Sequence, residues 1–292
     1  MSDLIRRLET NYPLKELVAL EALLRRASLV NMPFLLKGSL VTRQYFSDPT
    51  IRDAEDIDFL YLNKIHNVDQ AYNTFTDWMI QITEMDLNDG IKFRSFRENS
   101  FWRYIDYAMA EDFPTVNTDI EYYFTDDEKG ILNDELCLDV SFNLEMDGKP
   151  VPLEYRPVLG EKFSVPYTVP LSIQVAWKLH QTIVRPRFKD LYDLKHLLSH
   201  PSYDEHARKE TLQNLVNECS MDQSITKEDI KKILVDDLRN LDSLLTNDYN
   251  LRKFAGNENK KDYFIQCVTD LRKTMNKVGI NEHAFNHLPN PT

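Results

Sequence analysis

The pattern of apolar residues along the sequence changes close to residue 168, and this change constrains the fold most. Between residues 91 and 169, short runs of β-branched and aromatic residues are separated by Pro, Asp and Gly, a pattern typical of successive strands in one sheet. Beyond Pro170, apolar residues recur at helical spacing. A chain of 292 residues is long enough for two domains. We therefore predict an α+β protein, with a mixed sheet in residues 1–168 and an all-helical domain in residues 169–292.

Hydrophobic periodicity places the individual elements. In the first domain it predicts a long helix within the first thirty residues, further helices at 40–46 and 68–83, and strands at 34–36, 57–62, 91–93, 102–108, 116–124, 136–144, 151–155 and 165–169. In the second domain it predicts helices at 171–184, 189–198, 205–219, 227–246 and 260–277. The pair Gly38-Ser39 falls on a tight turn between a strand and a helix.

The charge balance limits the partners of the chain. Its 35 basic and 47 acidic residues give a net charge of −12, so no overall positive field draws it to nucleic acid or to an anionic membrane. A polyanionic ligand would therefore need a local basic patch or a metal ion. No apolar stretch approaches the length of a membrane span, and the N-terminus lacks the apolar core of a signal peptide. We expect no membrane partner and a cytoplasmic location.

Glycine and cysteine usage excludes further kinds of site. With seven glycines the chain contains neither G-x-G-x-x-G nor G-x-x-x-x-G-K-[S/T], so a bound nucleotide must be held in another way. The three cysteines lie far apart and form neither a disulfide framework nor a zinc knuckle.

The strongest candidate for chemistry is a turn at Gly38-Ser39 followed by Asp56-Ile57-Asp58 on the next strand. Side chains at positions i and i+2 of a strand share one face, so the two carboxylates project together. A divalent cation between them removes their repulsion, and an all-oxygen site suits Mg²⁺ or Mn²⁺. The glycine lets a phosphate approach the backbone. Each element alone also fits a simpler interpretation, namely two solvated acids and an ordinary turn; their order along the chain is what favours a site for a metal and a nucleotide.

This order resembles the polymerase β-like nucleotidyltransferases, and the chain is most similar to the AbiEii-type nucleotidyltransferases, toxins of abortive-infection and type IV toxin–antitoxin systems, with their MenT-like relatives. The first half of the resemblance is Leu36-Lys37-Gly38-Ser39 and the segment 52–59, Arg-Asp-Ala-Glu-Asp-Ile-Asp-Phe. Ala54 departs from the usual Ser or Thr. The second half is Lys178-Leu179-His180 with Arg185, followed by 189–194, where Lys-Asp replaces Arg-Asp. The resemblance spans about residues 30–200.

The resemblance implies a polymerase β-like domain in residues 1–168 and a helical domain that closes the nucleotide cleft. The implied activity is Mg²⁺-dependent transfer of a nucleoside monophosphate from a nucleoside triphosphate to an acceptor hydroxyl, at the 3′ end of an RNA such as tRNA, with a cognate antitoxin as partner. Metal and catalytic roles fall on Asp56, Asp58 and Asp139, with Lys178 and Asp190 as further catalytic residues. Nucleotide-binding roles fall on Lys37, Gly38, Ser39, Arg52, Arg185 and Asp193.

Two of these assignments have simpler alternatives. Lys178 on an amphipathic helix also fits a surface lysine, whereas the resemblance assigns it to triphosphate oxygens, with Asp190 and Asp193 on one face of the next helix to orient such cations. The family's third carboxylate fits Asp139, because an acid within an apolar strand is costly unless a cation compensates it. Asp119 and Glu121 compete for that role, although their regular alternation is typical of a half-exposed strand.

Two other classes of function remain open at this point. The chain would also fit a non-catalytic module that senses nucleotides or binds a partner through its helical half, although such a module would be expected to lose its metal ligands. A small-molecule adenylyltransferase of the antibiotic-modifying kind uses the same motifs on a different acceptor.

Overall fold

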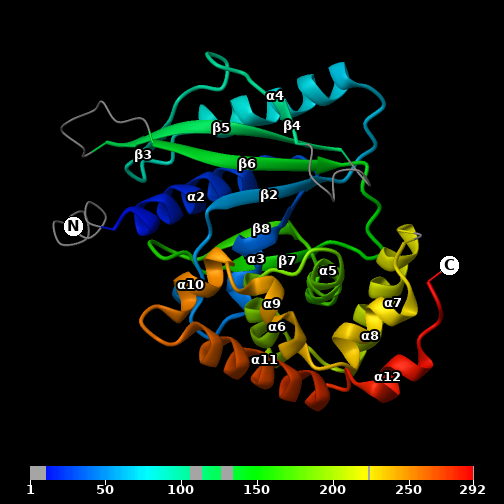
Figure 1. The fold of residues 1–292 in the computed structure, drawn as a ribbon. Helices are drawn as coiled ribbons and strands as arrows, with labels where there is room; N and C mark the ends of the chain where they lie inside the picture. Colours follow the sequence, from blue (N-terminus) through cyan, green and yellow to red (C-terminus); the bar gives the residue numbers. More distant parts are fainter. Residues whose placement is uncertain (1–10, 106–113, 126–133, 223, 292) are drawn as a thin grey trace. The chain divides into compact units, whose positions relative to one another are not determined.

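The computed structural model describes residues 11–105, 114–125, 134–222 and 224–291 (Figure 1). The chain divides into two compact units, Met1–Val169 and Pro170–Thr292. Within the described residues, no helix combines the length and the apolar character needed to cross a membrane.

The first unit is built on one mixed sheet, in the order β3-β5-β6-β2-β1-β8-β7, with β4 paired to β5. Its strands are β1 (Phe34–Lys37), β2 (Asp56–Tyr61), β3 (Ile91–Phe93), β4 (Arg103–Tyr104), β5 (Thr115–Phe124), β6 (Asp134–Phe142), β7 (Val151–Tyr155) and β8 (Phe163–Thr168). The pairs β2–β6 and β1–β8 are parallel, and the other pairs are antiparallel. The predicted mixed sheet and α+β class are therefore correct.

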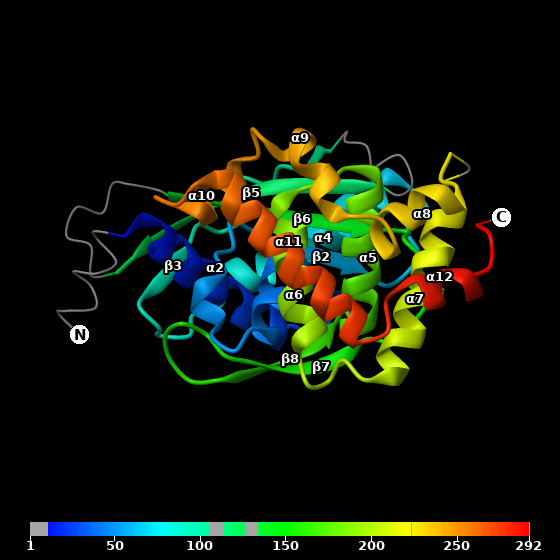
Figure 2. The same ribbon diagram turned by 60° about the horizontal axis from the view of Figure 1, so that its bottom comes forward.

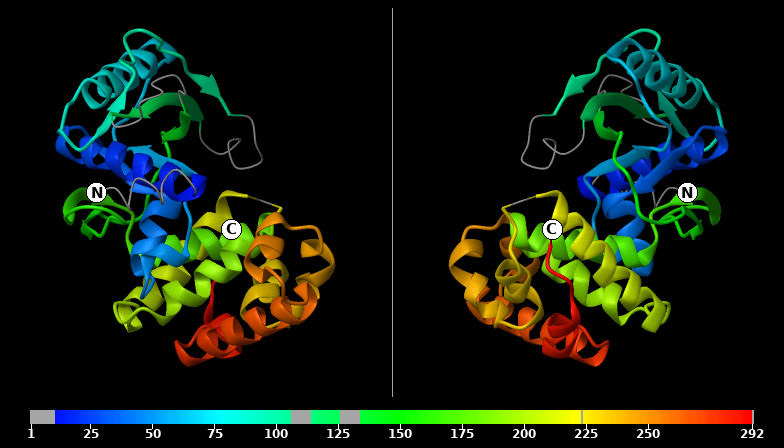
Figure 3. Two further views of the ribbon diagram at one scale, coloured as in Figure 1. Left: turned by 90° about the vertical axis from the view of Figure 1, so that its left-hand side faces the viewer. Right: turned by 90° about the vertical axis from the view of Figure 1, so that its right-hand side faces the viewer.

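Helices cover one face of this sheet (Figure 3). They are α2 (Tyr12–Leu29) and α4 (Val68–Thr83), which contact each other, and shorter helices precede β2: α3 (Gly38–Thr42), η1 (Arg43–Tyr45) and η2 (Pro49–Ile51). On α4, Trp78 stacks on Phe34 of β1 with ring centroids 3.7 Å apart and meets Phe59 of β2 edge-on. Strand alternation adds buried residues such as Val116 and Ile120 of β5 to this core.

The opposite face of β2, β6 and β5 carries the polar side chains. Between the buried residues of β5, Asn117, Asp119 and Glu121 are only half buried. On β6, Cys137 and Asp139 alternate in the same way with Leu138 and Val140. We call this the open face of the sheet, and it holds every strand acid that the sequence analysis singled out.

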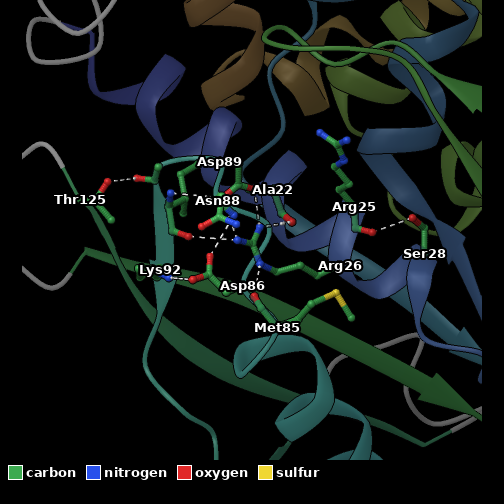
Figure 4. A network of polar contacts seen from close by, with 12 residues as sticks. Ala22, Arg25, Arg26, Ser28, Met85, Asp86, Asn88, Asp89, Lys92 and Thr125 are labelled. Atoms are coloured by element: carbon green, nitrogen blue, oxygen red, sulfur yellow. Dashed lines mark hydrogen bonds and ion pairs between the residues drawn. The ribbon is translucent and has the colours of Figure 1, made fainter.

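A buried arginine joins α2 to the segment between α4 and β3 (Figure 4). The Arg26 side chain is fully buried, and two of its nitrogens donate to the two carboxylate oxygens of Asp89 at 2.7 and 2.8 Å. Its remaining donors reach the carbonyl oxygens of Ala22, Met85 and Ile91 at 2.9 to 3.0 Å. All five guanidinium hydrogens are thus used, and these hydrogen bonds offset the cost of removing the charged side chain from water.

The second unit consists of helices in its described residues, from α5 (Leu171–Val184) to α12 (Glu282–His287). Between them lie α6 (Phe188–Ser199), α7 (Glu205–Met221), α8 (Lys227–Leu234), η3 (Leu238–Leu241), α9 (Asp242–Leu245), α10 (Tyr249–Ala255) and α11 (Lys260–Lys277). Figure 2 shows α11 running beside α6, with which it is in contact. Side-chain caps start several helices: Asp204 for α7, Thr226 for α8 and Asn259 for α11.

Some predicted elements were wrong. The single helix expected at 227–246 is divided into α8, η3 and α9, because Arg272 of α11 donates to the carbonyls of Ile233 and Val235 at 2.9 and 2.5 Å and so completes the end of α8. The helix expected at 40–46 is one short α-helical segment, α3, followed by η1. Helices α10 and α12 were not predicted. Of the strand expected at 102–108, residues 106–108 lie outside the described residues, as do the first ten residues of the chain.

Replacing Arg26 by Met should lower the free energy of unfolding by about 3 kcal/mol, because a buried ion pair loses one partner and three carbonyls lose the Arg26 donor. Urea unfolding measures this as a lower midpoint at constant slope. The neighbouring change Arg25→Met is the control, since the Arg25 side chain points away from the network (Figure 4). Equal midpoints for the two variants would contradict the role given to Arg26.

Candidate functional site

Gly38 stands where β1 ends, beside the strand that carries the paired acids. Its backbone is left-handed, with φ +74°, and a Cβ atom placed there would lie 2.0 Å from Oδ2 of Asp58. Such a contact is impossible without moving the carboxylate, so a glycine is required at this position. The helix that follows, α3, is only five residues long. The glycine therefore makes room for the Asp58 carboxylate. From the sequence, we had predicted only that it lets a phosphate approach the backbone.

Parallel pairing of β2 and β6 brings together acids that are far apart in the sequence. In the register of the two strands Asp58 lies opposite Asp139, and Asp56 lies opposite Cys137. Residues opposite each other in a ladder share a face, as do residues two apart in one strand. Asp56, Asp58 and Asp139 therefore project from the open face together, which is the arrangement predicted for metal ligands.

The charges of these acids act on one another. Burial, followed by repulsion from Asp58 and then Asp56, raises the pKa of Asp139 to about 6, although Lys37 works in the other direction. Burial, followed by repulsion from Asp139 and then Asp56, raises the pKa of the Cys137 thiol to about 12, so it is a neutral group beside Asp139, 3.7 Å from its Oδ1. The open face thus concentrates negative charge at one place in the sheet.

Lys37 and Ser39 frame the acids. The Lys37 ammonium lies 3.5 Å from Oδ1 of Asp58, and the Ser39 hydroxyl lies 3.4 Å from Oδ1 of Asp56. Among the described residues, no three acidic, histidine or cysteine side chains are already arranged as a metal-binding group. The donors themselves fit a hard divalent cation, because they are carboxylate oxygens that repel one another and share one face.

The competing acids on β5 have different partners. Asp119 forms an ion pair with Arg103, and Glu121 forms one with Arg94. Asp119 lies opposite Cys137 in the β5–β6 register, so β6 stands between it and β2, whereas Asp139 is the direct neighbour of Asp58. Among the three candidates for the third carboxylate, the register brings only Asp139 directly opposite a residue of the Asp-x-Asp pair.

A buried group that sequence reasoning missed holds the segment before β2. Arg43 of η1 is fully buried and forms an ion pair with Glu21 of α2. Its Nε donates to the carbonyl oxygens of Pro49 and Arg52 at 3.1 and 3.2 Å. Tyr155 donates to Glu21 at 3.2 Å. The signal in the sequence was an acid, Glu21, on the apolar stripe of α2. Through its ion pair with Arg43, Glu21 helps to position the segment that leads into β2.

Arg52 was assigned to the nucleotide, but its side chain is buried and its guanidinium donates to the Asp53 carbonyl. It therefore helps to shape the entry to β2. Arg185, assigned in the same way, belongs to the second unit, where it is exposed and caps α5: its amide donates to the Gln181 carbonyl at 2.8 Å.

The remaining predicted residues form a cluster inside the second unit. The Lys178 ammonium of α5 lies 3.1 Å from Oδ1 of Asp190 and 2.9 Å from Oδ2 of Asp193, both fully buried on α6. Arg187 reaches Asp190 at 2.7 Å. Burial favours the neutral form of Asp190, but Lys178 and Arg187 hold its pKa below the usual range. The predicted pairing of Lys178 with the two acids is thus present, and the interpretation of Lys178 as a loose surface lysine is wrong.

Comparison with known proteins identifies the family of this chain. The family model described as "Nucleotidyl transferase AbiEii toxin, Type IV TA system" matches residues 22–262. A search of curated protein sequences found no match. Among solved structures, the chain is similar to MenT4, the nucleotidyltransferase toxin Rv2826c from Mycobacterium tuberculosis H37Rv, at 12% identity and a TM-score of 0.49, over 95% of this chain and 85% of that one. Because the family model spans most of the sequence, including both acid-bearing strands and the Lys178 cluster, this chain belongs to the AbiEii nucleotidyltransferase toxin family and is a nucleotidyltransferase.

Proposed function

We propose that this protein moves a nucleoside monophosphate from a nucleoside triphosphate to the 3′-terminal hydroxyl of an RNA, with tRNA as the acceptor and Mg²⁺ as the metal. In this proposal residues 1–168 form a polymerase β-like nucleotidyltransferase domain and residues 169–292 form a helical domain. The observation that carries the proposal is the β2–β6 register, which sets Asp139 beside Asp58 with Asp56 on the same face.

Asp56 and Asp58 would hold Mg²⁺, or Mn²⁺, with Asp139 beside them. A bound divalent cation would neutralise charge on the triphosphate and on the departing pyrophosphate. The carboxylates supply the oxygen donors that such an ion prefers, and their mutual repulsion is the cost that its binding relieves.

The chain's own residues would organise an in-line displacement. The acceptor oxygen forms a bond to the α-phosphorus, the bond from that phosphorus to the bridging oxygen breaks, and pyrophosphate leaves. Asp139 orients the acceptor hydroxyl and takes its proton. Lys37, Ser39 and the Gly38 backbone contact phosphate oxygens, and Lys37 turns from Asp58 to the triphosphate once the carboxylate charge is compensated.

The Lys178 cluster supplies the second part of the proposal. Lys178 contacts triphosphate oxygens, and Arg185 contacts phosphate. Asp190 and Asp193 are positioning residues: both are buried and both bind the Lys178 ammonium, which fixes its direction. Without them a lysine on a long flexible stem would have to be ordered by the substrate itself.

Family membership supports growth arrest as the consequence and a cognate antitoxin as the partner. A net charge of −12 favours a small contact with the end of an RNA over a long groove, since backbone affinity comes from neutralised phosphates. The tRNA 3′ end, which is single-stranded and accessible, meets that requirement.

Changing Asp58 to Asn should lower nucleotide transfer about a thousandfold, equivalent to ~4 kcal/mol of transition-state stabilisation, because a metal ligand and its charge are lost. The assay incubates the protein with Mg²⁺, each labelled nucleoside triphosphate and total tRNA, and follows label in the RNA. Glu135→Gln, an exposed acid on β6, is the matched control and should keep full activity. Absence of label in the RNA with the wild type, or equal activity of the two variants, would refute the proposal that these acids support nucleotide transfer to tRNA. Label appearing only on small hydroxylated compounds would reassign the acceptor.

Gly38→Ala should reduce both transfer and stability, whereas Gly160→Ala should cost stability alone. Both glycines have a positive φ, +74° and +87°, so each substitution by alanine should lower the free energy of unfolding by about 1–3 kcal/mol through backbone strain. Only at Gly38 does the new methyl group displace the Asp58 carboxylate, since nothing lies within 4 Å of a Cβ at Gly160. Thermal unfolding and the transfer assay are measured together. Equal activity in the two variants would show that the Gly38 contact does not matter.

Asp139→Asn should make the metal-free protein more stable at pH 7.5 while transfer is lost. The pKa of Asp139 is raised to about 6 in the folded state, against about 4 in an unfolded chain. The contribution of this group to the free energy of unfolding is therefore complete below pH 4 and is lost as the pH rises through 6. The variant avoids this loss. Melting temperatures at pH 5 and 7.5 in EDTA measure it: the advantage of the variant should grow with pH. An advantage that does not change with pH would contradict the raised pKa.

A further inference from the structure

One row of side chains crosses the open face of the sheet. Strand registers pair Lys37 with Asp58, Asp58 with Asp139, Asp139 with Asn117, and Asn117 with Arg103. Residues opposite one another share a face, so all five project to the same side. The proposed chemistry uses the first three. Asn117 and Arg103 continue the row in the direction away from Lys37 and have no assigned role.

Arg103 belongs to the open face by an independent argument. Its neighbour Trp102 points to the helix-covered face, where its indole nitrogen donates to Thr76 of α4 at 3.2 Å and its ring packs against Phe75. Arg103, the next residue, donates instead to Asn117 and Asp119 of the open face. Arg103 keeps 44% of its side chain exposed there.

The Arg103 guanidinium is held in one direction by three contacts. Its Nε donates to Oδ1 of Asn117 at 3.0 Å, its Nη2 donates to Oδ2 of Asp119 at 2.5 Å, and it lies over the Phe101 ring at 5.6 Å from the centroid. An exposed arginine held by a carboxylate, an amide and an aromatic ring loses less rotamer entropy when it binds a ligand. These contacts use the Nε hydrogen and one Nη2 hydrogen. The remaining N–H groups of the guanidinium can donate to an anion.

The surroundings determine which ligand needs such a cation. The same face carries Asp56, Asp58, Asp139, Asp119 and Glu121, so an anion that approaches Asp139 is repelled. An RNA acceptor must nevertheless bring its 3′-hydroxyl to Asp139 with a phosphodiester attached to the same terminal nucleoside. β4 lies two strand spacings from β6, or about 10 Å, and an arginine side chain spans part of that distance.

We infer that Arg103, oriented by Asn117, Asp119 and Phe101, binds the phosphodiester that joins the 3′-terminal nucleoside to the rest of the acceptor RNA. This inference rests on the proposed function, because it takes the acceptor hydroxyl to lie at Asp139. The terminal nucleoside then lies over Asn117, between the reacting hydroxyl and the bound phosphate. Planar, bidentate phosphate recognition is the usual task of arginine, and a phosphate contact fixes position without reading sequence.

The experiment compares wild type with Arg103→Gln on a single-stranded acceptor RNA. The variant should raise the KM for RNA about tenfold and leave the KM for the nucleoside triphosphate unchanged, since one charge-assisted phosphate contact is lost. In a plot of log(kcat/KM) against log[salt], the slope for the variant should be shallower by about 0.7, the value for one phosphate contact on a single strand. Arg103→Lys should restore the salt slope, because it keeps the charge.

Chemistry on the RNA tests the position of the contact. An uncharged methylphosphonate at the last linkage should weaken the wild type about tenfold and should have little effect on Arg103→Gln, whereas the same replacement far upstream should affect both equally. Arg94→Gln is the matched control, because Arg94 is 46% exposed and also pairs with an acid of this face, Glu121. It should behave as wild type.

The outcomes separate the inference from the proposed function. If the wild type labels RNA but the terminal methylphosphonate weakens wild type and Arg103→Gln equally, the inference is wrong and the proposed function stands. If Arg103→Gln lowers kcat and both KM values change together with the melting temperature, Arg103 is a structural ion-pair residue and the inference is wrong. If the wild type labels no RNA at all, the proposed function fails first and the inference falls with it.

Discussion

The parallel pairing of β2 with β6 is the constraint on which the rest of the site depends. It places two carboxylates, 81 positions apart in the chain, directly opposite each other, which no antiparallel hairpin between neighbouring segments would do. The cost is electrostatic and is visible in the raised pKa of Asp139. Other features accommodate that pairing: the missing side chain at Gly38 makes room for the Asp58 carboxylate, and Lys37 offsets part of the charge.

Rigid supports around the acids explain how this costly arrangement persists. The Glu21–Arg43 pair ties α2 to the segment that enters β2, and Arg43 also binds the carbonyls of Pro49 and Arg52. On the covered face, Trp78 packs against Phe34 of β1 and Phe59 of β2, the strand that carries Asp56 and Asp58. Sites that act by holding charges in fixed positions need such support, because a displacement of one ångström loses most of the effect. In the second unit, Asp190 and Asp193 do the same for Lys178.

Sequence patterns predicted the elements that local interactions decide. The helix Val68–Thr83 was predicted with both ends correct, because Asn67 caps it and its apolar positions are periodic. The break within 227–246 was missed because Arg272, far along the chain, completes the end of α8. The motifs named the paired acids, but the choice between Asp139 and Asp119 depends on strand order and register, which alternation within one strand cannot reveal. Arg43 and Arg103 lie in no motif, and their importance arises only from what folding brings beside them.

Binding of Mn²⁺ together with a non-hydrolysable nucleoside triphosphate, followed by electron paramagnetic resonance, tests the central claim most directly, because it reports the ion without requiring turnover or an acceptor. We expect a protein-bound Mn²⁺ signal that depends on the nucleotide and disappears in Asp56→Asn. Asp119→Asn, an acid of the same face that already has an arginine partner, should retain it. A bound signal that survives Asp56→Asn, or one that is lost equally in Asp119→Asn, would contradict the assignment of the metal to the acids of β2.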